Sequence, residues 1–158
     1  MILFRDATMA DIPEIQRVRN SVHENKLSNP GLVTDDDCAD YLIKRGKGWV
    51  CEIQNVIAGF AIADLADHNI WALFVDPEFE KQGIGKKLHS IMMDWYFSKT
   101  KHTAWLNTAP HSRAGGFYKK AGWKETGIHC NNEIRFEMKY GNWKSNQNIS
   151  DHPSKTDK

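Results

Sequence analysis

A short apolar run, Ile70–Val75, is followed at once by Asp76-Pro77 and then by Gly83-Ile84-Gly85. The run is too short for a globular helix and is typical of a strand buried on both faces. Pro77 ends the strand, because proline has no amide hydrogen for a ladder and restricts the residue before it. An apolar stripe with helical spacing then runs from Ile84 to Trp95. The sequence predicts a strand, a glycine-bearing loop and a helix, in that order.

Such a unit brings free backbone amides and the positive end of a helix dipole to one point, which is how proteins bind phosphates. The spacing excludes a P-loop, because Glu80 stands where its first glycine is required and Lys87 takes the place of its Ser or Thr. It disfavours a dinucleotide fingerprint, because Leu88 takes the place of the third glycine. By themselves, Gly83 and Gly85 fit a tight turn without a ligand equally well.

The segments Val75-Asp76-Pro77 and Gln82–Leu88 resemble the acyl-coenzyme A signature of the GNAT N-acetyltransferase superfamily, Gln/Arg-x-x-Gly-x-Gly/Ala. In that family the loop amides bind the diphosphate of coenzyme A, and the preceding strand pairs with the pantetheine arm. The resemblance implies acetyl-CoA as cofactor. Glu80 departs from the usual Gln or Arg, and we expect it to modify affinity. The coenzyme-binding residues implied here are Leu73, Phe74, Val75, Lys81, Gln82, Gly83, Ile84, Gly85 and Lys86.

A second motif, Ala114-x-x-Phe117-Tyr118-x-Lys120-x-Gly122-Trp123, resembles another conserved block of the same family. The family's tyrosine lies near the coenzyme sulfur, so the resemblance implies Tyr118 as general acid for the leaving thiolate and as a coenzyme contact. An unperturbed phenol, with a pKa of about 10, keeps its proton at neutral pH. Packing beside Phe117 is the alternative role. Many relatives have an asparagine that binds pantetheine where His111 stands, and Asn107 is the other candidate for this contact.

The general base is the least defined part of the expected site. An attacking amine must lose a proton, and many relatives place a carboxylate where this chain has Asn69, which cannot act as a base. The nearby alternatives are Asp64, Asp67 and His68. No covalent nucleophile is required, so Cys51 and Cys130 are expected to be core or strand residues.

Bulk composition excludes several classes of protein. The chain has 158 residues, enough for one domain, and its net charge of +1 gives no strong field toward nucleic acid or an anionic membrane. Three cysteines without C-x-x-C spacing argue against a disulfide framework or a metal site and fit a cytoplasmic location. No apolar run is long enough to span a membrane, and the first residues do not form a signal peptide.

Periodicity and turn signals predict strands over residues 2–5, 49–53, 56–64, 70–75, 104–107, 123–128 and 134–140, with helices over residues 8–22, 34–45, 84–99 and 112–120. This order resembles the GNAT fold. It implies an α/β (α+β) class, with a mixed, mostly antiparallel sheet of about seven strands, splayed between the fourth and fifth, and helices on both faces. Residues 1–140 form the predicted single domain. Residues 141–158 are predicted to form a disordered tail, because they contain few apolar side chains that could be buried.

The resemblance implies an acyl-CoA-dependent N-acetyltransferase in which a primary amine of a small molecule or peptide attacks directly in a ternary complex. The alternative is a non-catalytic module that senses acyl-CoA or binds a partner protein. Nucleic-acid and membrane partners are not expected. The last strands of this fold often pair between subunits, which leaves a homodimer open by analogy.

Overall fold

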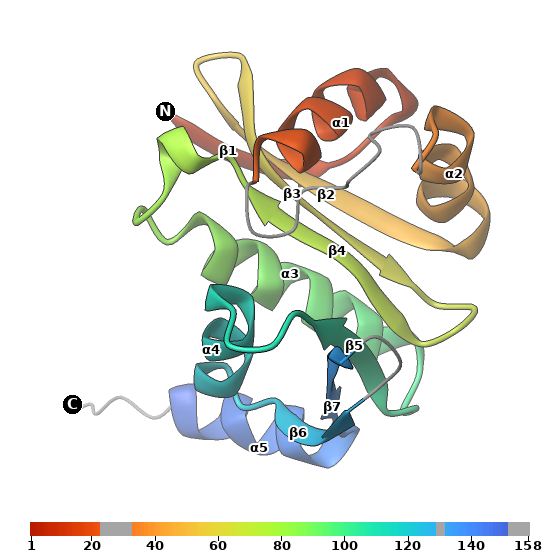
Figure 1. The fold of residues 1–158 in the computed structure, drawn as a ribbon, viewed down its shortest axis with the longest axis vertical. Helices are drawn as coiled ribbons and strands as arrows, with labels where there is room; N and C mark the ends of the chain where they lie inside the picture. The colour runs from red at the N-terminus through yellow and green to blue at the C-terminus, as the bar shows by residue number, and fades with distance from the viewer. Residues whose placement is uncertain (23–32, 129–131, 152–158) are drawn as a thin grey trace. The chain divides into compact units, whose positions relative to one another are not determined.

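The computed structural model describes residues 1–22, 33–128 and 132–151. The chain divides into two compact units, Met1–Lys99 and Thr100–Lys158 (Figure 1). All seven predicted strands are present, which confirms the α/β class. The predicted splay lies between strands of different units, and it stays a prediction, as does the single domain over residues 1–140. In the described parts of the chain, no helix has the length and apolar character needed to cross a membrane.

The first unit is built on four antiparallel strands that pair in chain order. They are β1 (Ile2–Asp6), β2 (Gly46–Ile53), β3 (Val56–Asp64) and β4 (Asn69–Val75). Gln54 and Asn55 join β2 to β3 with φ of 50° and 66°. Positive φ at both turn residues matches the twist of a two-residue hairpin.

Helices cover both faces of this four-stranded sheet, as predicted. Thr34 accepts a hydrogen bond from the Asp37 amide (3.1 Å) and caps α2 (Asp35–Ala39), which continues as the π-helix η3 (Asp40–Arg45). On that face, α1 (Ile12–Ser21) packs its apolar stripe against Phe60 of β3. Gly59 points to the opposite face, because successive strand residues alternate, and there it meets α3 (Ile84–Lys99).

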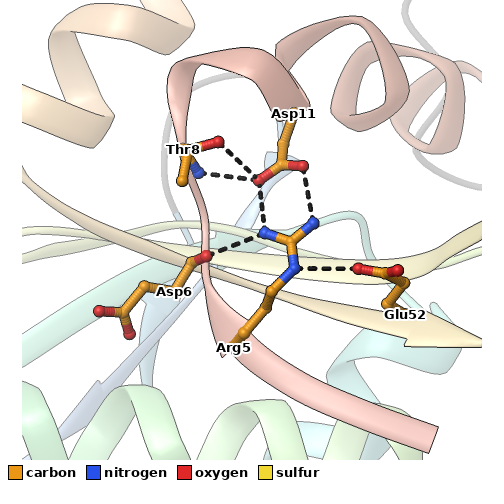
Figure 2. Close-up of polar contacts among 5 residues, drawn as sticks. All are labelled: Arg5, Asp6, Thr8, Asp11 and Glu52. Atoms are coloured by element: carbon orange, nitrogen blue, oxygen red, sulfur yellow. Dashed lines mark hydrogen bonds and ion pairs between the residues drawn. The ribbon is translucent and has the colours of Figure 1, made fainter. Parts of the chain in front are cut away.

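Arg5 ties the beginning of α1 to the sheet (Figure 2). Its terminal nitrogens bind both carboxylate oxygens of Asp11 at 2.8 and 2.9 Å, and its Nε binds Glu52 of β2 at 2.9 Å. Asp11 also accepts from the Thr8 amide at 2.8 Å. The Arg5 guanidinium lowers the pKa of Asp11, so this buried carboxyl stays ionised. The cluster fixes where α1 starts and therefore which of its residues face the sheet.

The described residues of the second unit form three antiparallel strands and two helices. Its sheet order is β5 (Ala104–Thr108), β7 (Ile134–Met138) and β6 (Lys124–Ile128), with α4 (Arg113–Lys120) between β5 and β6. Phe136 and Met138 are buried, whereas Arg135 and Glu137 form an ion pair at 3.0 Å on the other face. The side chains of this strand therefore alternate between a buried and a partly exposed face.

The structure corrects the prediction of a disordered tail from residue 141. Tyr140–Asp151 form the helix α5. Trp143 is 5% exposed, and a Cβ added to Gly122 would lie 2.5 Å from the Asn146 side chain, so α5 packs against this unit. One large apolar anchor makes ordering favourable although the average composition is polar. Residues 152–158, the rest of the predicted tail, lie outside the described residues.

Candidate functional site

Asp76 fixes the carboxyl end of β4. Its amide donates to the carbonyl oxygen of Ala58 at 2.8 Å, and its Oδ2 pairs with Nη1 of Arg17 at 2.9 Å. Its Oδ1 accepts from the Glu78 amide at 3.0 Å and caps the short helix η4 (Pro77–Phe79). Asp76 is 3% exposed. The strand end is therefore tied to β3, to α1 and to the following turn before the glycine loop begins.

The loop that follows turns by means of Lys81 and Gly83, whose φ values are 66° and 78°. A Cβ added to Gly83 would meet nothing within 4 Å, so the space in front of this residue is open. The first hydrogen bond of α3 runs from the Lys87 amide to the Gly83 carbonyl at 3.1 Å. The amides of Ile84, Gly85 and Lys86 precede it and have no partner within the helix.

The start of α3 lacks the side-chain cap that α2 and α4 have. Thr34 and Ser112 accept hydrogen bonds from first-turn amides of α2 and α4, whereas Gly83 has no side chain that could do so. The open amides and the positive end of the helix dipole therefore face the same open space. Lys81, Lys86 and Lys87 are exposed beside it. This arrangement can bind a phosphate or diphosphate.

Close packing holds the N-terminus of α3 in place. Ile84 is 2% exposed, and Leu88 is fully buried. A Cβ on Gly59 would lie 3.3 Å from both side chains and 2.9 Å from the Phe74 carbonyl oxygen, so glycine there allows α3 to approach β3. His89 on the same helix is also buried, and burial lowers its pKa to about 4, which keeps the ring neutral at pH 7.

The predicted pantetheine strand is more accessible than expected. On β4 only Ile70 and Ala72 are buried, whereas Leu73, Phe74 and Val75 are partly exposed. The prediction of a strand buried on both faces is therefore wrong for this half of β4. A partly exposed strand beside the open loop suits an extended ligand arm better than a closed core would.

The base candidates Asp64 and His68 lie in different environments. Asp64 is 1% exposed, pairs with Nη2 of Arg45 at 2.8 Å and accepts from the Ala66 and Asp67 amides at 3.1 and 3.3 Å. These contacts hold the β3–β4 turn together and leave little lone-pair capacity for a substrate proton. The third candidate, Asp67, is exposed.

His68 lies in the same turn with φ of 60°, and its Nδ1 lies 3.1 Å from the Tyr96 hydroxyl of α3. Burial, with a smaller contribution from the Asp64 charge, raises the pKa of Tyr96 to about 12. The phenol therefore stays protonated and orients the imidazole. A histidine ring held at the beginning of β4 has the chemistry of a general base.

Tyr118, Asn107 and His111 all belong to the second unit. Tyr118 on α4 is 7% exposed and packs edge-on against Trp123, with ring centroids 5.5 Å apart. Burial raises its pKa, so the hydroxyl retains a proton that it can donate. Asn107 is on β5, and within the described residues its buried Oδ1 has no hydrogen-bond partner. His111 is exposed, with φ of 57°, beside the Ser112 cap of α4.

The structure adds two arginines that the sequence analysis did not single out. Arg17 pairs with Asp76, and Arg19 is buried on the sheet-facing side of α1. Arg19 is four residues after Ile15 and thus occupies a position on the apolar stripe of the helix, which is the signal that could have identified it. In the described part of the chain, no group of three or more His, Cys, Asp and Glu residues is placed to hold a metal ion.

Comparisons with known proteins point to one family. Residues 13–123 match the sequence model of the acetyltransferase (GNAT) family. Among solved structures, the *Escherichia coli* ribosomal-protein-S18-alanine N-acetyltransferase shares 18% identity at a TM-score of 0.72, covering 89% of this chain and 94% of that one. The PaiA N-acetyltransferase of *Thermoplasma acidophilum*, in complex with coenzyme A, shares 16% identity at a TM-score of 0.74, covering 89% and 99%. At these low sequence identities, the TM-scores show that the folds are alike. A search of curated proteins found no match.

Proposed function

The chain belongs to the acetyltransferase (GNAT) family, and from this premise we propose that it transfers an acetyl group from acetyl-CoA to a primary amine within a ternary complex. The observation that carries the proposal is the uncapped N-terminus of α3, which opens beside Gly83 at the end of β4. Open amides at a helix start, flanked by exposed lysines, match the charge and geometry of a diphosphate.

The residues present fit coenzyme A. The amides of Gly83, Ile84, Gly85 and Lys86 would hold the diphosphate, since the space before Gly83 is open. The partly exposed residues Leu73, Phe74 and Val75 would lie along the pantetheine arm. From the family resemblance we propose Asn107, whose carbonyl oxygen can accept a hydrogen bond, as a further coenzyme contact. Lys81, Gln82 and His111 complete the proposed contacts. When bound, acetyl-CoA supplies the thioester carbonyl carbon that the amine attacks.

Two side chains of this chain would move protons in the proposed reaction. Tyr118, which burial keeps protonated, donates its proton to the leaving thiolate. His68 is the stronger base candidate for the attacking ammonium, because Asp64 is engaged by Arg45 and two amides.

The test is an amine panel assayed with acetyl-CoA by release of free thiol, together with calorimetric titration of coenzyme A. We expect Tyr118→Phe to lower kcat about 100-fold, the low end of the range for a general acid, with little change in coenzyme affinity. Tyr140→Phe, at the start of α5, is the matched control and should keep full activity. An unchanged kcat in Tyr118→Phe would remove the acid assignment. Coenzyme binding without turnover of any amine would identify a non-catalytic acyl-CoA-binding module instead.

A further inference from the structure

Arg19 of α1 occupies an unusual place for a charged side chain. It is 6% exposed, and its guanidinium carbon lies 4.8 Å from the ring centroid of Trp71, 5.0 Å from that of Phe74 and 5.7 Å from that of Phe60. We call these four residues the Arg19 cluster. All of them belong to the first unit, with the three rings on β3 and β4. Contact with ring faces is favourable for a cation but forms no hydrogen bonds.

Four other arginines of the described chain have carboxylate partners. Arg5 pairs with Asp11, Arg17 with Asp76, Arg45 with Asp64 and Arg135 with Glu137. For Arg19 the described residues contain no such ion pair, and its buried Nε and Nη2 have no hydrogen-bond partner there. These two nitrogens share one edge of the guanidinium, and their N–H bonds are parallel. Such an edge is the fork that binds both oxygens of a carboxylate.

Burial of an unpaired guanidinium opposes folding. Desolvation lowers the pKa of Arg19, yet an arginine remains charged at neutral pH. An apolar residue of similar length would pack against these rings as well as Arg19 does. The buried, unpaired edge of Arg19 therefore needs an explanation other than packing.

A β-bulge shapes the surroundings of this edge. Ile62 pairs with Ala72 and Ala63 with Ile70, which leaves Trp71 as an extra residue. A bulge re-aims side chains, and here Trp71 packs with the core that contains Phe60. Its ring stacks on Tyr41 of η3, with centroids 3.9 Å apart and planes at 7°. Trp71, Phe74 and Tyr41 are all partly exposed, so a solute can approach this face of the sheet.

We propose that the Nε–Nη2 edge of Arg19 binds a carboxylate of the acceptor, so that the acceptor is a carboxylate-bearing amine such as an amino acid or a peptide. The identification of this carboxylate compound as the acceptor rests on the proposed function. The binding of a carboxylate by Arg19 does not. Trp71 is near the beginning of β4, close in sequence to His68, whereas the proposed diphosphate site follows the other end of the strand. The pantetheine arm, which Phe74 would contact, is uncharged, so we assign the anion to the acceptor rather than to the coenzyme.

Thermal unfolding of the full chain without coenzyme tests the binding directly. The probes are the proteinogenic amino acids, their N-acetyl derivatives and their matched carboxamides, with acetate as the minimal anion. We expect at least one carboxylate compound to raise the Tm of the wild type while its carboxamide does not. Arg19→Met should abolish that shift and leave the ligand-free Tm equal to or above that of the wild type.

Arg19→Lys keeps the charge but not the fork and guards against a folding defect in Arg19→Met. We expect it to bind the same carboxylate about tenfold more weakly than wild type, the loss of one charge-assisted hydrogen bond. The proposal fails if no carboxylate compound binds the wild type, or if both variants bind it as well as the wild type does. It also fails if calorimetry shows that Arg19→Met loses coenzyme A affinity, because the edge would then serve the coenzyme. Failure of the proposed function would appear separately, as absent coenzyme binding or absent thiol release in the wild type.

Discussion

The two arginines of α1 that reach the sheet show two ways of preparing a binding surface. Arg17 pairs with Asp76, donates to the Ile57 carbonyl and so helps to fix the loop that leads to Gly83. Arg19, two residues further on, lies over aromatic rings, and its Nε and Nη2 have no partner among the described residues. At the glycine loop, paired side chains hold open main-chain amides in place. At the Arg19 cluster, the side chain itself is the unpaired group.

The difference predicts how each region responds to substitution. A loop that binds through amides tolerates many side chains but is sensitive to charge and backbone conformation at its glycine. The framework behind it should be sensitive to the loss of one ion-pair partner. The Arg19 cluster should show the reverse behaviour, since removal of its charge is expected to abolish binding without loss of stability.

The largest effect is expected from Gly83→Asp compared with Gly83→Asn. Both residues tolerate positive φ and are nearly equal in shape, so they differ mainly in charge. A carboxylate beside the diphosphate should weaken coenzyme A binding at least about 100-fold, and the amide much less. Isothermal titration calorimetry measures both affinities. Equal affinities for the two variants would show that no anion binds in front of Gly83.

Asp76→Asn tests the framework behind the loop. The substitution keeps the size of the side chain but removes the buried Asp76 charge that Arg17 binds, and we expect the free energy of unfolding to fall by about 2 kcal/mol. Glu14→Gln is the matched control. Glu14 pairs with the same Arg17 at 2.9 Å, but its side chain is 44% exposed, so its loss should cost less than about 1 kcal/mol. Urea denaturation measures both, and similar costs would contradict the assigned role of Asp76.

Acid should weaken the helix that presents the amides. The folded pKa of His89 is about 4, below the ordinary 6.5, so between these values the unfolded chain binds a proton that the folded chain does not. Stability is therefore full above about pH 7 and falls by roughly 3 kcal/mol as the pH decreases toward 4. His89→Gln should reduce this slope in urea denaturation at several pH values. An identical slope in wild type and variant would show that His89 is not its source.

The smallest effect is expected from Glu80→Gln. Glu80 stands where the family signature has Gln or Arg, close in sequence to the proposed diphosphate site. Neutralisation should raise coenzyme A affinity about two- to threefold at low salt, because a partly exposed charge is screened by solvent. The gain should vanish at high ionic strength. A gain that is unaffected by salt would point to a change in loop conformation instead.

The sequence predicts the glycine loop and its flanking elements well, because local chemistry determines them. Pro77 ends a strand and Gly83 permits positive φ in any fold, so the unit around them can be identified without tertiary information. Thr34, Ser112 and Gly122 mark helix ends for the same reason.

The Arg19 cluster could not be predicted in the same way, because it depends on contacts between distant segments. The bulge at Trp71 arises from a register shift between β3 and β4. The position of Arg19 on the apolar stripe of α1 indicates that it faces the sheet but not which rings it contacts. The helix α5 was missed for a related reason, since Trp143 is a single anchor in an otherwise polar segment. The proposed roles of Tyr118, Asn107 and His111 stay predictions from the family resemblance.

The central claim is that main-chain amides at the start of α3 bind the diphosphate of coenzyme A. Titration of ¹⁵N-labelled protein with coenzyme A, followed by backbone NMR, tests it most directly. We expect the largest amide shifts at Gly83, Ile84, Gly85 and Lys86. Pantetheine, which lacks the diphosphate, should shift the same amides less. Saturable binding that leaves these four amides unshifted, or no binding at all, would contradict the account.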